Sequence, residues 1–216
     1  PPTTPLDDTL SLHDALPIYM VSVDGDTSTN DMVCVLANGL AGNPEITETG
    51  KDFNAFRRAL NKVTTYLCRC IAKDGEGATK LLECKVTGAK TKNAAKLVAK
   101  SVIKSSLFKA AMFGADANWG RVLCAVGYSG ADVDVSKVDV SFKSRFGRID
   151  VCKNGSGIEF SEEEAKKVLG ADEIQILIEL NDKSGKATAW GCDLTYDYEI
   201  GRASCRERVS SSGELS

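Results

Sequence analysis

The sequence contains a single histidine, His13, and none between residues 19 and 198. An imidazole is the base of Ser-His-Asp and Cys-His enzymes and a usual ligand of zinc, so its absence excludes these mechanisms from residues 19–198. Long hydrophobic runs are also missing, because no stretch approaches the ~20 apolar residues that cross a membrane. We therefore predict no metal site and no membrane partner.

The two ends of the chain look foreign to the rest. TLSLHDALPI (9–18) and EIGRASCRERV (199–209) can be encoded by one DNA string and its reverse complement, and this string resembles a common sequencing adapter. We interpret 1–18 and 199–216 as artefacts, expect both to be disordered and leave them out of the fold analysis. Residues 19–198 then form a fragment of a longer protein.

The charge of this central part is balanced. The chain has 27 basic and 30 acidic residues, and setting aside the 3 basic and 6 acidic residues of the two ends leaves 24 of each. A neutral segment argues against nucleic acid or an anionic membrane as the main partner.

Cysteines are frequent, and residues 19–198 hold seven of them. We interpret all seven as buried thiols of a reducing compartment, and not as metal ligands or disulfides. The expected location is the cytoplasm, or an organelle if the source is a eukaryote. The seven are Cys34, Cys68, Cys70, Cys84, Cys124, Cys152 and Cys192.

Hydrophobic spacing predicts a mixed α/β fold of the α+β type. The longest helix is expected over 51–73, where apolar residues recur every three or four positions and predict one buried face. Further helices are expected over 30–38, 92–105, 118–126 and 161–169, and strands over 19–23, 79–86, 138–142, 148–152, 174–180 and 187–196.

The order of these elements suggests two domains. The first part, 19–88, is helix-rich. The second part, 89–198, is sheet-rich and is expected to form a smaller α+β domain. The boundary is expected in the segment Gly88-Ala89-Lys90.

Two polar segments are candidates for a binding site. VDGDTSTND (23–31) is either a turn with helix-capping groups or a polar floor for a substrate, with Asn30 as a weak candidate. KDGEGATK (73–80) sets Glu76 between two glycines at a helix-to-strand junction. The glycines either end the helix or let the backbone approach a ligand closely, and composition does not decide between the two.

Two other segments favour a structural interpretation. FGADANWGR (113–121) places Asn118 as a helix N-cap before a buried Trp119. AWGCDLTYDY (189–198) predicts a strand with Trp190 and Tyr196 on its buried face and Asp193 exposed.

Together, in this order and spacing, these four segments closely resemble the β chain of glutamate N-acetyltransferase, also called ornithine acetyltransferase, an enzyme of arginine biosynthesis. The resemblance covers essentially all of 19–198. It implies that 19–88 belongs to a catalytic domain built as a layered α/β sandwich. It implies a precursor that cuts itself before a threonine, which then carries the acetyl group of N-acetylornithine to glutamate as an acyl-enzyme. An N-terminal threonine can act without an imidazole.

The resemblance also implies roles for particular residues. Glu76 matches the family's substrate-binding glutamate. The nucleophilic threonine is expected upstream of Tyr19, so this chain is expected to hold no catalytic residue and to be inactive by itself. The expected partner is the α chain of the same precursor, which supplies the oxyanion hole, in a heterotetramer of two α and two β chains. No cofactor is implied, although acetyl-CoA can serve as a co-substrate.

Two alternatives remain open on the sequence. The chain could belong to a related self-processing aminopeptidase or amidase with an N-terminal nucleophile. It could also be a non-catalytic binding domain, in which Glu76 would only be part of a helix-ending turn.

Overall fold

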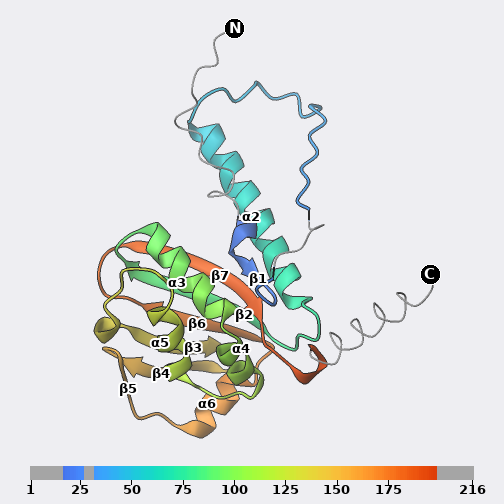
Figure 1. Ribbon diagram of the computed structural model, residues 1–216. Helices are drawn as coiled ribbons and strands as arrows, with labels where there is room; N and C mark the ends of the chain where they lie inside the picture. Colours follow the sequence, from blue (N-terminus) through green and yellow to red (C-terminus); the bar gives the residue numbers. More distant parts are fainter. Residues whose placement is uncertain (1–16, 27–31, 199–216) are drawn as a thin grey trace, which may run out of the picture.

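The computed structural model describes residues 17–26 and 32–198, which form one mixed sheet with helices on both of its faces (Figure 1). The strands are β1 (Val21–Ser22), β2 (Leu81–Ala89), β3 (Asp139–Ser144), β4 (Gly147–Lys153), β5 (Ser156–Gly157), β6 (Glu173–Glu179) and β7 (Gly185–Cys192). The helices are η1 (Pro17–Met20), α2 (Lys51–Lys73), α3 (Lys92–Lys104), α4 (Ser106–Phe113), α5 (Trp119–Gly127), η2 (Val135–Lys137) and α6 (Glu162–Leu169).

The sheet has the strand order β1-β7-β2-β6-β3-β4-β5. β2 lies inside it, antiparallel to β7 and parallel to β6, while β1 runs parallel to β7 at one edge. As a result, the C-terminal ends of β1 and β7 lie beside the N-terminal end of β2, at one end of the strands.

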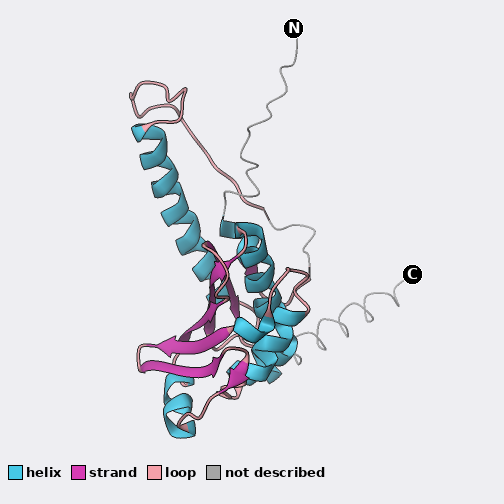
Figure 2. Ribbon diagram, turned by 90° about the vertical axis from the view of Figure 1, so that its left-hand side faces the viewer, coloured by secondary structure: helices cyan, strands magenta, loops and turns pink. Residues whose placement is uncertain are grey.

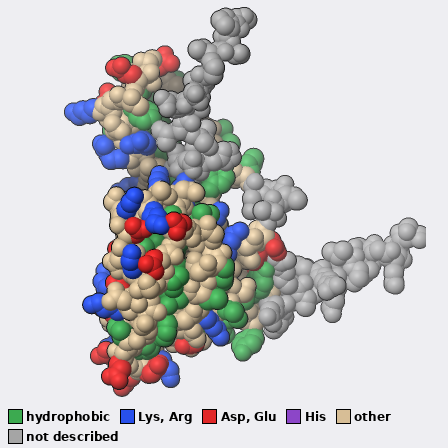
Figure 3. All heavy atoms as spheres, turned by 60° about the vertical axis from the view of Figure 1, so that its left-hand side comes forward, with side chains coloured by type: hydrophobic (Ala, Val, Ile, Leu, Met, Phe, Trp, Pro, Cys, Tyr) green, Lys and Arg blue, Asp and Glu red, His purple; other side chains and the backbone are tan. Residues whose placement is uncertain are grey.

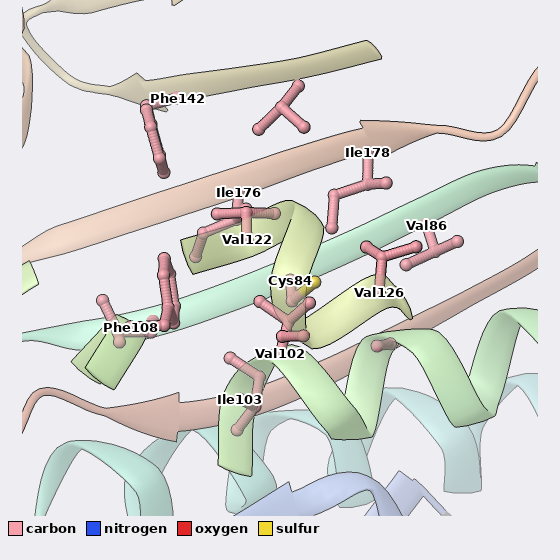
Figure 4. Packing of buried hydrophobic residues seen from close by; sticks show 14 of the residues in the cluster. Cys84, Val86, Val102, Ile103, Phe108, Val122, Val126, Phe142, Ile176 and Ile178 are labelled. Carbon is pink, nitrogen blue, oxygen red and sulfur yellow. The ribbon is translucent and has the colours of Figure 1, made fainter. Parts of the chain in front are cut away.

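The main core lies between the sheet and the helices α3 to α5. Alternate residues of β2, namely Leu82, Cys84 and Val86, point to this face and are fully buried. Figure 4 shows side chains from these helices and from β2, β6 and β3 directed toward one another, among them Phe108 of α4 and Phe142 of β3. α6 adds Ala165, Val168 and Leu169 to the same cluster.

The opposite face is covered by one end of α2. Cys68 and Ala72 of this helix form a small second cluster with Leu81 and Trp190 of the sheet. In Figure 2 the rest of the helix extends beyond the sheet. Only the C-terminal turns of α2 are therefore anchored to the fold.

The predicted fold class is confirmed, and the expected secondary structure holds in most places. Helix α2 has the bounds 51–73 that its spacing predicts, and α3 (expected over 92–105) buries one face that includes Val98, Val102 and Ile103. Asn118 and Ser161 cap α5 and α6 with their side chains, as helix N-termini prefer. α4 was not expected, because its eight residues are mostly apolar and show little periodicity.

Two expectations about the first part of the chain are wrong. The described residues of the expected helix 30–38 have no regular structure, and their apolar side chains, such as Leu36 at 92% exposure, contact no core. In α2, Phe56, Val63 and Ile71 of the expected buried face are exposed. An amphipathic pattern gives a buried face only where a partner covers it, and residues 17–26 and 32–198 cover only the side of the last turns that carries Cys68 and Ala72.

Three of the differences between expected and observed boundaries bear on how the chain is divided. η1 begins at Pro17, two residues before the expected boundary at Tyr19, and Ile18 packs against the second cluster. β2 runs to Ala89, past the expected domain boundary, and pairs with strands from beyond residue 170. The division into two domains itself stays a prediction. β7 ends at Cys192, four residues earlier than expected.

The prediction of seven buried thiols is wrong for three cysteines. Cys68, Cys84, Cys152 and Cys192 are buried, whereas Cys34, Cys70 and Cys124 are exposed. Burial raises the pKa of the Cys68 thiol to about 11, and it raises that of Cys84 further. The exposed cysteines lie on the uncovered segment 32–46, on α2 and on α5, where hydrophobic spacing alone suggested a buried face.

Candidate functional site

The loop between α2 and β2 carries Glu76 at the sheet edge where β1 and β7 end. The Glu76 side chain is exposed, and its carboxylate has no hydrogen bond or ion pair with residues 17–26 or 32–198. A carboxylate in this state keeps its acceptor sites for a cationic ligand.

The two glycines beside Glu76 are needed because other parts of the chain approach them closely. A Cβ on Gly75 would lie 2.9 Å from the Cys192 sulfur, and a Cβ on Gly77 would lie 2.7 Å from the backbone nitrogen of Tyr198. Gly77 also has a φ of +66°, which disfavours any residue with a side chain.

The C-cap interpretation does not describe Gly75. α2 ends at Lys73, its C-cap is Asp74, whose N–H donates to the Cys70 carbonyl, and Gly75 does not adopt a left-handed conformation as that interpretation requires. Close approach of a ligand to the loop stays a prediction. The groups that approach the glycines closely belong to the chain itself, in the segments that surround the loop. The glycines thus allow the loop to pack, and they leave Glu76 at its surface.

The end of the loop is held by Asp193, which follows β7. Its carboxylate accepts hydrogen bonds from the Thr79 N–H at 2.8 Å and the Lys80 N–H at 2.9 Å, and the Thr79 hydroxyl donates to it as well. Asp193 is only 3% exposed, so the prediction that it faces solvent is wrong. The strand stops at Cys192, and the alternation of sides on which that prediction rested stops with it.

The middle of the loop is held by Thr195. This buried hydroxyl donates to the Gly77 carbonyl at 2.6 Å and accepts from the Tyr198 N–H at 3.4 Å. Tyr196, expected to be buried, is 74% exposed and meets Phe113 edge to face at 5.7 Å. No pattern in the sequence singled out Asp193 or Thr195.

The turn after β1 lies against the same loop. The Tyr198 hydroxyl donates to the Asp24 carboxylate at 3.1 Å, and the Asp26 N–H donates to the same side chain at 2.9 Å. The buried Lys109 of α4 donates from its ammonium group to the Val23 carbonyl. The beginning of the VDGDTSTND segment is thereby joined to the Glu76 loop, while residues 27–31, including Asn30, lie outside the described residues.

Two titratable groups next to the loop have shifted pKa values. Burial lowers the pKa of Lys80, an effect that the Asp193 carboxylate opposes, and the Lys80 ammonium donates to the Met112 carbonyl at 2.6 Å. Burial also raises the pKa of Cys192. The Cys192 thiol is therefore protonated at neutral pH and is a poor nucleophile.

The remaining segment, FGADANWGR, is structural for most of its length. Asn118 caps α5 by accepting from the Arg121 N–H at 3.1 Å, and Trp119 packs against Gly157 and the main core. Only its first residue, Phe113, reaches the Glu76 region, through Tyr196.

A cleft lies apart from Glu76. Its volume is about 420 Å³, and residues of α2, β2, β3, β6 and the turn after β3 line it, including Arg69, Glu83 and Arg145. Most of its charges are paired within the chain: Arg69 binds Glu83 at 2.6 Å, and Arg145 binds Asp172 at 3.2 Å. Basic and acidic groups are interspersed on the face drawn in Figure 3, and neither sign forms a continuous patch there.

Membrane and metal features are absent from the described residues. Within 17–26 and 32–198, no helix is long and apolar enough to cross a membrane. The same residues contain no group of three or more His, Cys, Asp or Glu side chains arranged to hold a metal ion.

Comparison with known proteins decides the family. The ArgJ family matches residues 6–202, nearly the whole chain. The chain belongs to the ArgJ family. The resemblance noted in the sequence is thereby confirmed, and the chain corresponds to the β-chain region of this family.

Individual members of the ArgJ family agree with this assignment. The chain is 55% identical over 179 residues to "Arginine biosynthesis bifunctional protein ArgJ 1" of Clostridium acetobutylicum, covering 83% of this chain and 44% of that protein. It is also 55% identical to the ArgJ protein of Caldanaerobacter subterraneus subsp. tengcongensis, with the same coverage. The chain thus spans less than half the length of these relatives.

A solved ArgJ structure has the same fold. The crystal structure of arginine biosynthesis bifunctional protein argJ from Bacillus halodurans superposes with a TM-score of 0.82 at 46% sequence identity. The superposition covers 88% of this chain and 87% of the crystallised one. The mixed sheet and its helices are therefore the architecture of this part of the ArgJ family.

Proposed function

We propose that the full-length protein containing this chain transfers an acetyl group from N-acetylornithine to glutamate in arginine biosynthesis, and that Glu76 binds the substrate. The observation that carries this proposal is the exposed Glu76 carboxylate, which has no partner among the described residues yet sits on a loop held at two points. Family membership supports the reaction, since the relatives are named as bifunctional proteins of arginine biosynthesis.

The charge of Glu76 suits one of the two amino acids in particular. The α-amine of N-acetylornithine is acetylated and neutral, so its side-chain ammonium is the one cationic group that this donor presents. A carboxylate binds an ammonium through charge-assisted hydrogen bonds, which are shorter and stronger than neutral ones. Glu76 would therefore bind the donor and orient its acetyl group.

The covalent step belongs to a threonine outside residues 19–198. Its hydroxyl oxygen attacks the acetyl carbonyl, the ornithine amine leaves with a proton, and a threonine ester remains. The α-amine of glutamate then attacks this ester and releases the threonine hydroxyl. Splitting the transfer into two steps is the general advantage of covalent catalysis. Acetyl-CoA could replace N-acetylornithine as the donor in the first step, and the chemistry requires no other cofactor.

The α chain of the same precursor is the proposed partner. Apolar side chains of α2 and of the segment before it are exposed, and large exposed apolar surfaces mark association sites. The chain also spans only 44% of a relative's length, so much of the precursor is available to cover them. Assembly into a heterotetramer, the cytoplasmic location, the role of Asn30 and the inactivity of the chain alone stay predictions.

Family membership favours acetyl transfer over the two alternatives. An aminopeptidase or amidase would share the N-terminal nucleophile, but the relatives at 55% identity are named for arginine biosynthesis. In a non-catalytic binding domain Glu76 would only be part of a helix-ending turn, but the C-cap of α2 is Asp74, two residues before it.

Glu76→Gln in the full-length precursor tests the proposal, because it keeps the size of the side chain and removes its charge. A charge-assisted contact contributes roughly 1.5–3 kcal/mol, so kcat/KM for N-acetylornithine should fall about tenfold to a hundredfold. Self-cleavage and folding should be unchanged, because the side chain is exposed and has no partner in the described structure.

Asp74→Asn is the matched control, since Asp74 is an exposed carboxylate at the start of the same loop. It should leave kcat/KM within about twofold, as is usual for exposed charges. Equal losses in the two variants would mean that the loop acts only through its overall charge, and an unchanged kcat/KM in Glu76→Gln would refute the assignment of Glu76.

A further inference from the structure

The loop that carries Glu76 is fixed on its exit side and in its middle by different side chains. Asp193 binds the backbone at Thr79 and Lys80, where the chain enters β2. The loop closes on itself through the Ala78 N–H, which donates to the Gly75 carbonyl at 2.9 Å. Neither interaction involves the Gly77 carbonyl or connects the middle of the loop to the segment after β7.

Thr195 acts at the residue next to Glu76. Its hydroxyl donates at 2.6 Å to the carbonyl of Gly77, and its burial keeps water from replacing this bond. Among the hydrogen bonds of the described residues, this one connects Gly77 to the segment after β7. Without it, the Gly77–Ala78 peptide would keep the bond of its N–H to Gly75 inside the loop, but its carbonyl would lose the tie to the segment after β7. Glycine tolerates a wide range of backbone angles, so the loop could then shift relative to that segment at little cost.

Thr195 is itself held in place. The Tyr198 N–H donates to its hydroxyl at 3.4 Å, and the neighbouring Leu194 N–H donates to the carbonyl of the buried Lys109 at 3.3 Å. The segment after β7 is thus a fixed support against which the loop is positioned.

We infer that Thr195 is a positioning residue that sets the place of the Glu76 carboxylate through its hydrogen bond to the Gly77 carbonyl. This inference rests on the proposed function of Glu76 in substrate binding. Binding groups must be held close to their productive geometry, and small displacements reduce the rate steeply. Thr195 does not touch the substrate in this account, and its whole effect passes through Glu76.

The test is a double-mutant cycle in the full-length precursor. Thr195→Val keeps the shape of the side chain and removes the hydroxyl, and Thr195→Ser keeps the hydroxyl and removes the methyl group. We expect Thr195→Val to lower kcat/KM for N-acetylornithine about fivefold to tenfold, mainly through KM, because it weakens a contact present throughout the reaction. Thr195→Ser should stay within about twofold of the parent enzyme.

The decisive comparison is made in the Glu76→Gln background. If Thr195 acts through Glu76, adding Thr195→Val there should change kcat/KM by less than about twofold, since coupled residues are not additive. A full fivefold to tenfold loss in that background would overturn the inference, as would equal losses from the Val and Ser variants. An unaffected kcat/KM in Glu76→Gln alone would instead refute the proposed function, so the two failures are distinct.

Thr87→Val is the matched control for the substitution itself. Thr87 lies toward the other end of β2, and its hydroxyl also donates within the chain, to Glu179 at 2.6 Å. This variant should leave KM unchanged. Soluble, self-cleaved enzyme is the criterion of folding. If Thr195→Val fails it, Thr195→Ala replaces this variant in the same cycle and is judged by the same outcomes.

Discussion

Glu83 holds α2 to the sheet, and its removal should destabilise the fold more than any surface charge. This side chain of β2 is 7% exposed and accepts from Arg69 at 2.6 Å, Lys85 at 2.7 Å, the Trp190 indole at 2.8 Å and Gln175 at 3.0 Å. Glu83→Ala would leave the buried Trp190 indole and the half-buried Gln175 amide without this acceptor. An unsatisfied buried donor costs about 1–3 kcal/mol.

The expected loss in the free energy of unfolding follows from these contacts. Breaking a buried ion pair on one side costs about 3–5 kcal/mol. Arg69 is partly exposed and keeps a second partner, Glu173 at 2.7 Å, which places the loss near the lower limit. We expect about 3 kcal/mol for Glu83→Ala and about 1–2 kcal/mol for Glu83→Gln, which retains one acceptor oxygen.

Urea unfolding followed by circular dichroism measures these losses, and Glu173→Gln is the matched control. Glu173 also binds Arg69 but is largely exposed, so its replacement should cost less than about 1 kcal/mol. If Glu83→Ala costs no more than Glu173→Gln, the view that burial and multiple donors make Glu83 important is wrong.

The same residue predicts a pH dependence. Burial alone would raise the pKa of the Glu83 carboxyl, but the hydrogen bonds from Lys85 and Trp190 and the charges of Lys85 and Arg69 outweigh it and lower the pKa. A folded-state pKa below the unfolded value of about 4.3 gives stability that is complete above that value and is lost as the pH falls through the folded pKa. The stability difference between the parent chain and Glu83→Gln should therefore shrink below about pH 4.

Two further variants probe the loop and the exposed apolar surface. Gly77→Ala should lower the thermal midpoint, because a left-handed alanine costs about 1–2 kcal/mol and its Cβ would lie 2.7 Å from the Tyr198 nitrogen. Gly127→Ala is its control: the added Cβ would have no atom within 4 Å, so this variant should be neutral or stabilising. Phe56→Glu on α2, where the side chain is 60% exposed, should leave the chain folded but weaken its co-purification with the α chain. Tyr128→Glu is the control, and equal binding by both variants would argue against α2 as the contact surface.

The sequence predicted elements well where local pattern and packing agree. α3 has five apolar residues on one face and a threonine cap, and both its bounds and its buried side follow from that spacing. α2 has an equally clear pattern, yet its buried side was predicted wrongly. The periodicity shows which side of the helix is apolar, but it does not show whether this chain or another one covers that side.

The candidate site was predictable only in its centre. Glu76 was identified by its two glycines and by the family resemblance, whereas Asp193 and Thr195 follow a strand and showed no pattern of their own. Their contacts join residues more than 110 positions apart, 114 for Asp193 with Thr79 and 118 for Thr195 with Gly77. Glu83 was missed in a similar way, because alternation along β2 assigns it to the face away from the main core, and nothing local indicates that α2 and Trp190 cover that face.

The geometry of α2 also has a thermodynamic consequence. A helix of 23 residues is ~34 Å long, and this one is fastened to the sheet by its last turns, through Cys68, Ala72 and Arg69. Isolated helices are only marginally stable in water, so the remaining turns gain little from their own hydrogen bonds. Formation of the whole helix and docking of the surface that covers it are therefore coupled equilibria. Completing α2 reduces the net affinity between the two halves of the precursor. A substitution that raises the intrinsic helicity of α2 should therefore tighten the association of the two halves without touching the interface.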